Sequence, residues 1–249
     1  MKKNAPTLNI LLPVYNEEKR LENGVRKADA YLDGQKDIPY VLTIVDNAST
    51  DRTEMIARSL CGEMDHVRYI KVSEKGVGAA FREGIKNNSC DYVGYMDIDL
   101  STDLHHLREM YDIFCGNENV DLVNGSRWNR ASHTAGRKWY RNLTSFGLVC
   151  VLKASFGMKA TDAICGFKFY KKAVAERLIR QTFPDNGWFF IIEMLIRAEK
   201  SGMNIHELPV VWNDDKDNST VHAVRQTMDY LRKIAALKKR LRAVPVGEN

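Results

Sequence analysis

Two aspartates directly follow an apolar segment of this sequence. Asp97 and Asp99 come after residues 92–96 and flank Ile98, so in an extended chain their side chains point to one side and that of Ile98 to the other. Carboxylate oxygens are the ligands that Mg²⁺ and Mn²⁺ prefer, and such ions keep positions open for phosphate oxygens. The pattern predicts a divalent-metal site. A helix cap or a solvated loop is the structural alternative, because D-x-D is a common spacing.

Polar residues end two further apolar segments. Asp46 closes the segment that begins at residue 41, where a carboxylate can accept a hydrogen bond from a ribose hydroxyl or a base imide. Residues 13–18 close the first segment, where Tyr15 can stack on a nucleobase and Glu17 can bind a ribose. The alternative for the acidic residues is a helix start, where negative charge is favoured.

The glycine-containing segment at residues 75–81 suggests a comparison with dinucleotide-binding loops. Phe81 stands where the last glycine of that fingerprint belongs, and the first apolar segment ends in Pro13 and Tyr15 instead of glycines. A hydride-transferring Rossmann enzyme is therefore disfavoured. Gly76 and Gly78 still permit a close backbone approach to a ligand, or a tight turn.

A sheet must bring these segment ends together. β-rich runs at residues 8–14, 41–45, 67–72, 92–96 and 120–123 alternate with helical patterns, which predicts an α/β fold with a mostly parallel central sheet and helices on both faces. Ligands of such sheets bind beyond the carboxyl ends of the strands. After Gly125 we expect a helix near residues 140–156, a strand at 165–170, two helices and a strand at 204–212, which would enclose an acceptor.

Composition limits the class of protein. A chain of 249 residues with 44% hydrophobic residues can bury one substantial core. The five cysteines are widely spaced and lack a C-x-x-C pair, so neither a disulfide framework nor a zinc site is expected. A reducing cytosol fits best. The apolar run at residues 8–14 is too short for a signal peptide or a transmembrane helix.

Five motifs together resemble the family 2 glycosyltransferases of GT-A fold. They are, in order, PVYNEE at residues 13–18, DNASTDRT at 46–53, KGVGAAFREG at 75–84, DIDLS at 97–101 and GSRW at 125–128. The CGFK element at residues 165–168 resembles the dolichyl-phosphate glucose and mannose synthases and favours the glucosyl branch. The resemblance covers about residues 7 to 220.

The resemblance implies roles for individual residues. It implies a nucleotide-sugar donor, UDP-glucose or alternatively GDP-mannose, bound by Pro13, Tyr15, Glu17, Val45, Asp46, Asp97, Ile98 and Arg127. It implies Mg²⁺ or Mn²⁺ on Asp99 with help from Ser101. It also implies a catalytic group made of Asp97, Asp99, Arg127 and Glu193. For Arg127, whose planar fork suits phosphate oxygens, a routine ion pair is the structural alternative.

Three positions depart from the family pattern. Asn47 stands where a second Asp near the nucleotide is usual, Ile191 replaces the Asp two residues before Glu193, and Thr220 stands where a Lys is common. A sugar-hydroxyl acceptor needs a positioned base. A polyprenyl phosphate, mostly a dianion at pH 7, does not. The missing Asp therefore favours a polyprenyl-phosphate acceptor.

The last part of the chain is strongly basic. Seven Lys or Arg residues lie between Arg225 and Arg242 against a single Asp229, and apolar residues recur there at helical spacing. This pattern predicts a basic amphipathic helix that lies on an anionic membrane surface, or else a helix that packs on the core. Nucleic-acid binding is not expected, because no aromatic interleaving or known motif supports it.

The sequence thus predicts a GT-A domain over residues 1–220, divided into a nucleotide-sugar half (1–124) and an acceptor half (125–220), and a basic helix and tail over 221–249. The expected activity is inverting transfer of a hexose to a polyprenyl or dolichyl phosphate, in the cytoplasm or on the cytoplasmic membrane face. The alternatives are transfer to a polysaccharide or another soluble acceptor, and a non-catalytic nucleotide-sugar-binding role.

Overall fold

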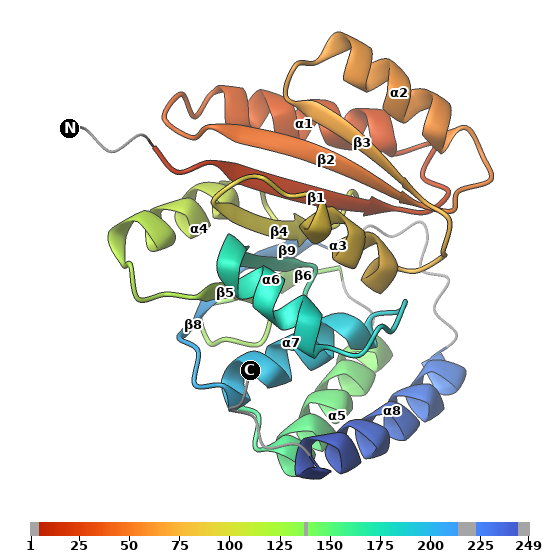
Figure 1. The fold of residues 1–249 in the computed structure, drawn as a ribbon, viewed down its shortest axis with the longest axis vertical. Helices are drawn as coiled ribbons and strands as arrows, with labels where there is room; N and C mark the ends of the chain where they lie inside the picture. The colour runs from red at the N-terminus through yellow and green to blue at the C-terminus, as the bar shows by residue number, and fades with distance from the viewer. Residues whose placement is uncertain (1–4, 137–138, 214–222, 244–249) are drawn as a thin grey trace.

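A seven-stranded sheet forms the centre of the fold (Figure 1). The computed structural model describes residues 5–136, 139–213 and 223–243, and the side chains of 5–136, 143–213 and 228–242. The prediction at Thr220 lies outside these ranges. In spatial order the strands are β3 (Val67–Val72), β2 (Tyr40–Asn47), β1 (Leu8–Val14), β4 (Tyr92–Met96), β7 (Phe167–Lys171), β5 (Leu122–Ser126) and β8 (Ile205–Pro209).

The sheet is mostly parallel, as the sequence predicts. Strands β1 to β4 are parallel to their neighbours within that group, and β5 is parallel to β8. Strand β7 is antiparallel to both β4 and β5 and separates them. The chain therefore reverses inside the sheet, which the regular alternation of the first half does not predict.

The single strand expected at residues 204–212 is wrong. Strand β8 ends at Pro209, and β9 (Val211–Asn213) pairs with β6 (His133–Ala135) in a separate two-stranded sheet. Pro209 has no N–H to continue a ladder. The N–H of Val210 donates to the Ser126 carbonyl while its own carbonyl accepts from the His133 N–H, so the chain passes from one sheet to the other at this residue.

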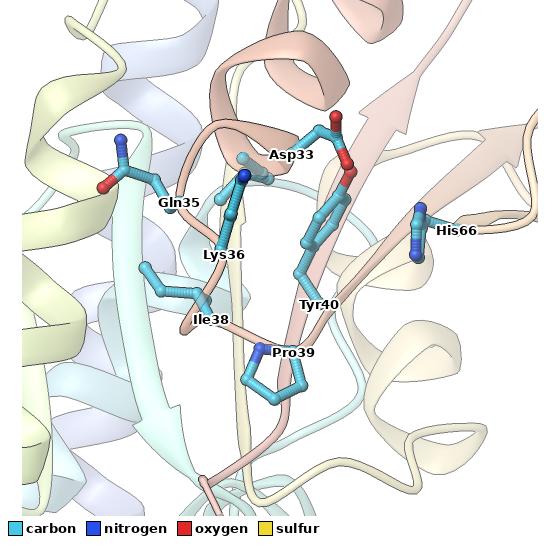
Figure 2. A pocket seen from close by; sticks show the side chains of 8 residues that line it. Asp33, Gln35, Lys36, Ile38, Pro39, Tyr40 and His66 are labelled. Atoms are coloured by element: carbon cyan, nitrogen blue, oxygen red, sulfur yellow. The ribbon is translucent and has the colours of Figure 1, made fainter.

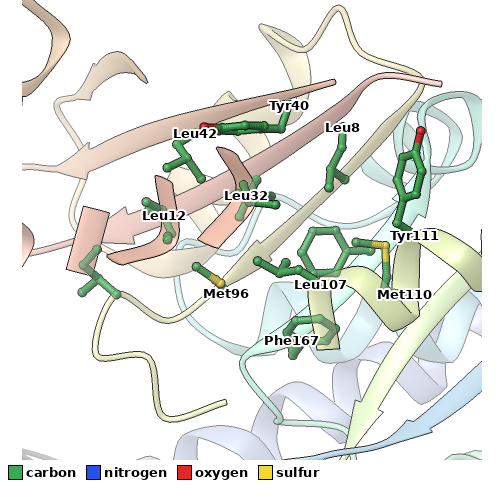
Figure 3. Packing of buried hydrophobic residues seen from close by; sticks show 14 of the residues in the cluster. Leu8, Leu12, Leu32, Tyr40, Leu42, Met96, Leu107, Met110, Tyr111 and Phe167 are labelled. Atoms are coloured by element: carbon green, nitrogen blue, oxygen red, sulfur yellow. The ribbon is translucent and has the colours of Figure 1, made fainter. Parts of the chain in front are cut away.

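Helices cover both faces of the main sheet, which confirms the predicted GT-A-type α/β architecture. Buried side chains of β1 alternate between two clusters because successive strand residues point to opposite faces. Figure 3 shows part of the first cluster, in which Leu12 and Leu42 of the sheet join Leu32 and Met110 of the helices. One face carries α1 (Leu21–Asp33), α2 (Thr53–Glu63) and α4 (His105–Gly116); the other carries α3 (Val77–Lys86), α5 (Trp139–Phe156), α6 (Lys172–Gln181), α7 (Phe189–Lys200) and α8 (Ala223–Ala243).

The basic helix α8 packs against the domain. Ile234 and Leu237 are buried in the same cluster as residues of α5 and α7, whereas Met228 and Leu231 on other turns of α8 are exposed. Figure 1 shows α8 beside α5. The proposed boundary near residue 220 stays a prediction. Among the described residues, none of the helices has the length and apolarity needed to cross a bilayer.

Helix α1 lies directly against the segment that carries the two aspartates. A Cβ on Gly24 would lie 2.5 Å from the Ile98 carbonyl oxygen, which is closer than real Cβ atoms approach. The absence of a side chain at Gly24 therefore lets α1 support the Asp97–Asp99 segment from behind.

We expect Gly24→Ala to destabilise the protein by about 1–3 kcal/mol, because the backbone of Ile98 must shift to make room. Gly62→Ala in α2 is the matched control, since its added Cβ meets nothing within 4 Å and a helical alanine is the better helix former. Urea denaturation of both variants measures the difference. Equal stability of the two variants would contradict this account of α1.

Candidate functional site

Three strained turns mark the carboxyl edge of the sheet. Asn16, Ala48 and Leu100 have φ values of 54°, 67° and 53°, and among the described non-glycine residues they alone have positive φ. They follow β1, β2 and the Asp97–Asp99 pair, so all three lie where parallel strands end. Such backbone strain costs of order 1–3 kcal/mol per residue and clusters at ligand sites. This edge is therefore the candidate site.

The Asp97 carboxylate lies in a tightly packed position without a hydrogen-bond donor among the described residues. It is partly buried and contacts Gly166 so closely that a Cβ there would lie 1.8 Å from Oδ2. Burial, and then the neighbouring Asp99 carboxylate, raise the pKa of Asp97 to about 8. The glycine of the CGFK element thus makes room for a carboxylate that needs a positive partner.

Asp99 and Ser101 complete an oxygen-rich group. The Asp99 Oδ1 accepts the Ser101 N–H at 2.9 Å, while the buried Ser101 Oγ has no hydrogen-bond partner among the described residues. An unpartnered buried hydroxyl on the residue that contacts the Asp99 carboxylate suits a hard divalent ion with oxygen ligands. The residues present fit Mg²⁺ or Mn²⁺, and the assignment of Asp99 and Ser101 as ligands stays a prediction.

Arg127 forms a buried ion pair with Asp162. Its Nε and Nη2 donate to the two Asp162 carboxylate oxygens at 2.7 and 3.0 Å, and its guanidinium lies 5.6 Å from the Trp212 ring centroid. Burial opposes the charge of Asp162, but the Arg127 guanidinium holds the pKa of that carboxyl below its usual value. The pair orients Arg127 at the end of β5. Its predicted contact with donor phosphates stays a prediction.

Lys168 is a charged residue that the sequence analysis did not select. It is fully buried on β7, and its Nζ donates to the Asn124 Oδ1 at 2.5 Å. Asn124 in turn donates to the Asp162 carbonyl at 2.9 Å. Burial lowers the pKa of Lys168. The CGFK motif contains the residue, but only the antiparallel insertion of β7 places it under the site.

Asp46 and Tyr15 are the residues predicted to contact the nucleotide. Asp46 is fully buried, where its Oδ1 accepts the Ser49 N–H at 2.9 Å and its Oδ2 accepts the Tyr69 hydroxyl at 3.0 Å. The Lys75 ammonium lies 3.7 Å from the centroid of the Tyr15 ring. Both predicted nucleotide residues therefore lie at the strand ends, with Asp46 fixed from within and one face of Tyr15 next to a cation.

The other predicted donor residues lie on the same edge. Glu17 is partly buried and accepts two hydrogen bonds from Arg20, at 2.8 and 2.7 Å. Pro13 is partly buried opposite Val45 in the β1–β2 register, and Val45 and Ile98 are buried. The fold brings these residues to one edge, and their contacts with a donor stay predictions.

Asn47 explains one departure from the family pattern. It is buried; its Nδ2 donates to the Val14 carbonyl at 2.6 Å and its Oδ1 accepts the Gly76 N–H at 2.9 Å. An aspartate could accept the second bond but could not donate the first. The amide therefore joins the ends of β1 and β2 to the loop after β3.

Glu193 has its polar contacts with residues of the second half of the chain. Its Oε1 accepts hydrogen bonds from Arg197 and from the Phe183 N–H, and its Oε2 lies 4.0 Å from Arg240 of α8. No hydrogen bond between described residues joins it to Asp97, Asp99 or Arg127. Its catalytic role stays a prediction, and Ile191 on the same helix is a buried core residue.

Two other features do not make a better site. His105, His106 and Glu109 are close enough to hold a metal, but the Val211 N–H donates to the His106 Nε2, so the Nδ1 carries the proton and faces Glu109. The pocket of about 260 Å³ in Figure 2 lies where β2 begins, at the opposite end of the strands. None of the predicted site residues lines it.

The helix-covered, mostly parallel sheet of this chain has a GT-A-type α/β fold. The family model described as glycosyl transferase family 2 matches residues 9–179, and the chain belongs to that family. This confirms the family that the five motifs resemble.

Named relatives agree with the favoured branch. The chain is 30% identical to glycosyltransferase AglD of Haloferax volcanii over 226 residues, which are 89% of this chain but only 35% of that protein. It is 28% identical to dolichyl-phosphate beta-glucosyltransferase of Dictyostelium discoideum over 83% of this chain and 66% of that protein. The chain therefore spans about a third and about two thirds of the length of these relatives.

Solved structures support the fold. Glucosyl-3-phosphoglycerate synthase from Mycobacterium tuberculosis, in complex with UDP, superposes with a TM-score of 0.69 over 96% of this chain and 81% of that one, at 20% identity. Other crystals of that synthase contain UDP with Mn²⁺ or Mg²⁺.

The raised pKa of Asp97 makes a stability prediction for metal-free protein. Between pH 3.8, the ordinary pKa of an Asp, and about pH 8, the folded protein keeps the Asp97 proton that the unfolded chain has released. The contribution of this proton to the free energy of unfolding is therefore fully present below pH 3.8 and is lost as the pH rises through 8. In EDTA, Asp97→Asn should melt at least about 3 °C above the wild type at pH 8.5, and the difference should narrow at pH 5. A constant difference across this range would contradict the prediction; differential scanning calorimetry decides.

Proposed function

We propose that this protein transfers a hexose from a nucleotide sugar, UDP-glucose in preference to GDP-mannose, to a polyprenyl or dolichyl phosphate with inversion at the anomeric carbon. The observation that supports it best is the Asp97–Asp99 pair beside the unpartnered Ser101 hydroxyl at the edge where family 2 donors are expected. The names of the dolichyl-phosphate beta-glucosyltransferase relatives support the choice of acceptor and sugar.

In the proposed mechanism the strand ends hold the donor. Tyr15, Glu17 and Asp46 contact the nucleoside, and Asp97 lies at the sugar diphosphate. Asp99, with Ser101, would hold the divalent ion. When bound, that ion neutralises the charge that develops on the leaving diphosphate. The Asp162 carboxylate holds Arg127 in a fixed orientation, so its remaining N–H groups can reach the donor phosphates without reorganisation.

The acceptor then attacks from the opposite face of the sugar. A phosphate oxygen forms the new bond to C1 while the bond from C1 to the diphosphate oxygen breaks, and the electron pair leaves with the nucleoside diphosphate. Ile191 is a core residue where the family has an Asp, so α7 offers no carboxylate at that position to deprotonate a sugar hydroxyl. A phosphate dianion needs no such base.

A lipid acceptor requires access to a membrane, and one surface suits that role. Leu143 and Phe146 of α5 and Met228 and Leu231 of α8 are large apolar side chains that are more than 40% exposed. Basic residues of α8, among them Arg232, Lys238 and Arg242, accompany them. We propose that this α5–α8 surface rests on an anionic bilayer, so that the protein is peripheral on the cytoplasmic face.

A soluble acceptor is the second candidate. The structurally similar synthase is named for glucosyl-3-phosphoglycerate, and crystals of it contain Mn²⁺ and UDP together with that compound or with phosphoglyceric acid. The chemistry at the anomeric carbon would use the same strand-end residues, so the acceptor assay separates the two candidates. A nucleotide-sugar-binding role without transfer is the third.

Purified protein with Mn²⁺ or Mg²⁺, polyprenyl phosphate and radiolabelled UDP-glucose should transfer label into the organic phase, and less from GDP-mannose. Asp99→Ala should lower this turnover at least about 10²-fold with a far-ultraviolet spectrum like that of the wild type, because the leaving diphosphate loses its charge partner. Turnover of Asp99→Ala within twofold of the wild type would remove the metal-site assignment. Label that appears only in water-soluble product would favour the second candidate.

The membrane proposal predicts that Phe146→Ser and Leu231→Ser together weaken binding to vesicles containing anionic lipid at least about tenfold, since each exposed apolar side chain loses its burial in the bilayer. Met55→Ser is the control, because Met55 is 61% exposed on α2, on the other face of the sheet. Co-sedimentation measures all three proteins. An equal loss with the control would remove the α5–α8 surface as the binding face.

A further inference from the structure

Helix α8 is tied to the loop between α6 and α7 by an ion pair. The Lys233 Nζ lies 2.6 Å from the Asp185 Oδ2 of that loop and 2.7 Å from the Asp229 Oδ2 of its own helix. The side chains of Lys233 and Asp185 are 30% and 16% exposed. One ammonium therefore joins two carboxylates in a partly buried position, where an ion pair is less screened than on an open surface.

The loop that Lys233 contacts is itself well ordered by hydrogen bonds. The Asp185 Oδ1 accepts the Gly187 N–H at 2.8 Å. Arg82 of α3 donates to the Asp185 carbonyl at 3.2 Å and to the Asn186 Oδ1 at 2.9 Å. Movement of Asp185 would therefore also move Asn186.

Asn186 determines the position of the glycine-containing segment. Its carbonyl accepts the N–H groups of Gly78 and Ala79, at 2.9 and 3.3 Å, and so caps the first turn of α3. A Cβ on Gly76, whose φ is 134°, would lie 2.0 Å from that carbonyl oxygen. The glycines thus allow the α6–α7 loop to approach α3 closely. The sequence analysis gave a ligand or a tight turn as the two alternative reasons for these glycines.

The same segment reaches the donor edge through Asn47. The Gly76 N–H donates to the Asn47 Oδ1, and the Asn47 Nδ2 donates to the Val14 carbonyl. Asn47 directly follows Asp46, and Lys75, which precedes Gly76, lies over the Tyr15 ring. Direct contacts therefore run from α8 through Asp185, Asn186 and Gly76 to the two strand ends that carry the nucleotide residues.

We propose that Lys233 is a positioning residue for the nucleotide-sugar site, acting through the α6–α7 loop and Asn47. The inference rests on the proposed function, because it takes the ends of β1 and β2 as the nucleotide site. Lys233 also belongs to the helix proposed to rest on the bilayer, so the position of α8 and the affinity for the donor are linked. By reciprocity, a bound donor favours the same position of α8.

The test uses the full chain as wild type, Lys233→Met, Lys233→Arg and Lys239→Met. Lys239 is exposed on the same helix, and no ion pair with a described residue involves it, so its replacement removes the same charge without touching the loop. Binding of UDP with Mn²⁺ is measured by calorimetry in the absence of membranes, together with KM for the donor, kcat and the melting temperature.

We expect Lys233→Met to raise the Kd of UDP and the KM of the donor about three- to tenfold while kcat changes less than twofold, because the residue touches neither the sugar nor the acceptor. Lys233→Arg should restore most of the affinity, and Lys239→Met should leave it unchanged. Asp185→Asn should match Lys233→Met, and the double variant should be no weaker than either single one. Asp185→Asn alone tests the inference if Lys233→Met does not fold.

Unchanged UDP affinity in Lys233→Met or Asp185→Asn, with wild-type protein that binds UDP, would overturn this inference and leave the proposed function standing. An equal loss in Lys239→Met would also overturn it, since general charge would then be the cause. Wild-type protein that binds neither UDP nor GDP would overturn the proposed function and, with it, this inference.

Discussion

The central constraint is the burial of a carboxylate beside a second one. Asp97 and Asp99 lie at the end of β4, where burial and mutual repulsion raise the pKa of Asp97 to about 8. The surroundings are shaped to keep this arrangement. Gly166 leaves room for the Asp97 carboxylate, and Gly24 lets α1 support the backbone behind it. The fold thus holds an unfavourable charge arrangement that a divalent ion would relieve.

The buried ion pair of Arg127 with Asp162 is the counterpart of this constraint. Two hydrogen bonds hold the guanidinium of Arg127 against the carboxylate of Asp162. Lys168 is a second buried cation, and its ammonium donates to Asn124. Removing one partner of such a pair is costly, because the other charge stays buried. The site is therefore supported by charges whose positions are fixed before any ligand arrives, which is how preorganised electrostatic stabilisation works.

The predicted donor edge is held in place by backbone turns and by one side-chain amide. Strained turns at Asn16, Ala48 and Leu100 follow the strand ends, and the Asn47 side-chain amide joins two strands to the loop after β3. The α6–α7 loop then packs on that loop through Asn186. Elements from the two halves of the sequence thus contact one another at this edge, and the division into a nucleotide half and an acceptor half stays a prediction.

The sequence by itself determined the family, the α/β architecture, the strand-end aspartates and the basic amphipathic helix, because periodicity and residue type are local properties that survive without coordinates. Only the tertiary structure decided that β7 enters the sheet antiparallel, that residues 204–212 form strands in two sheets, and that Lys168 and Asp162 lie beneath the site. It also decided that Glu193 pairs with Arg197. Apart from the Glu193–Arg197 pair, whose residues are four positions apart, these outcomes depend on contacts between residues 35 to 105 positions apart, which no local pattern encodes.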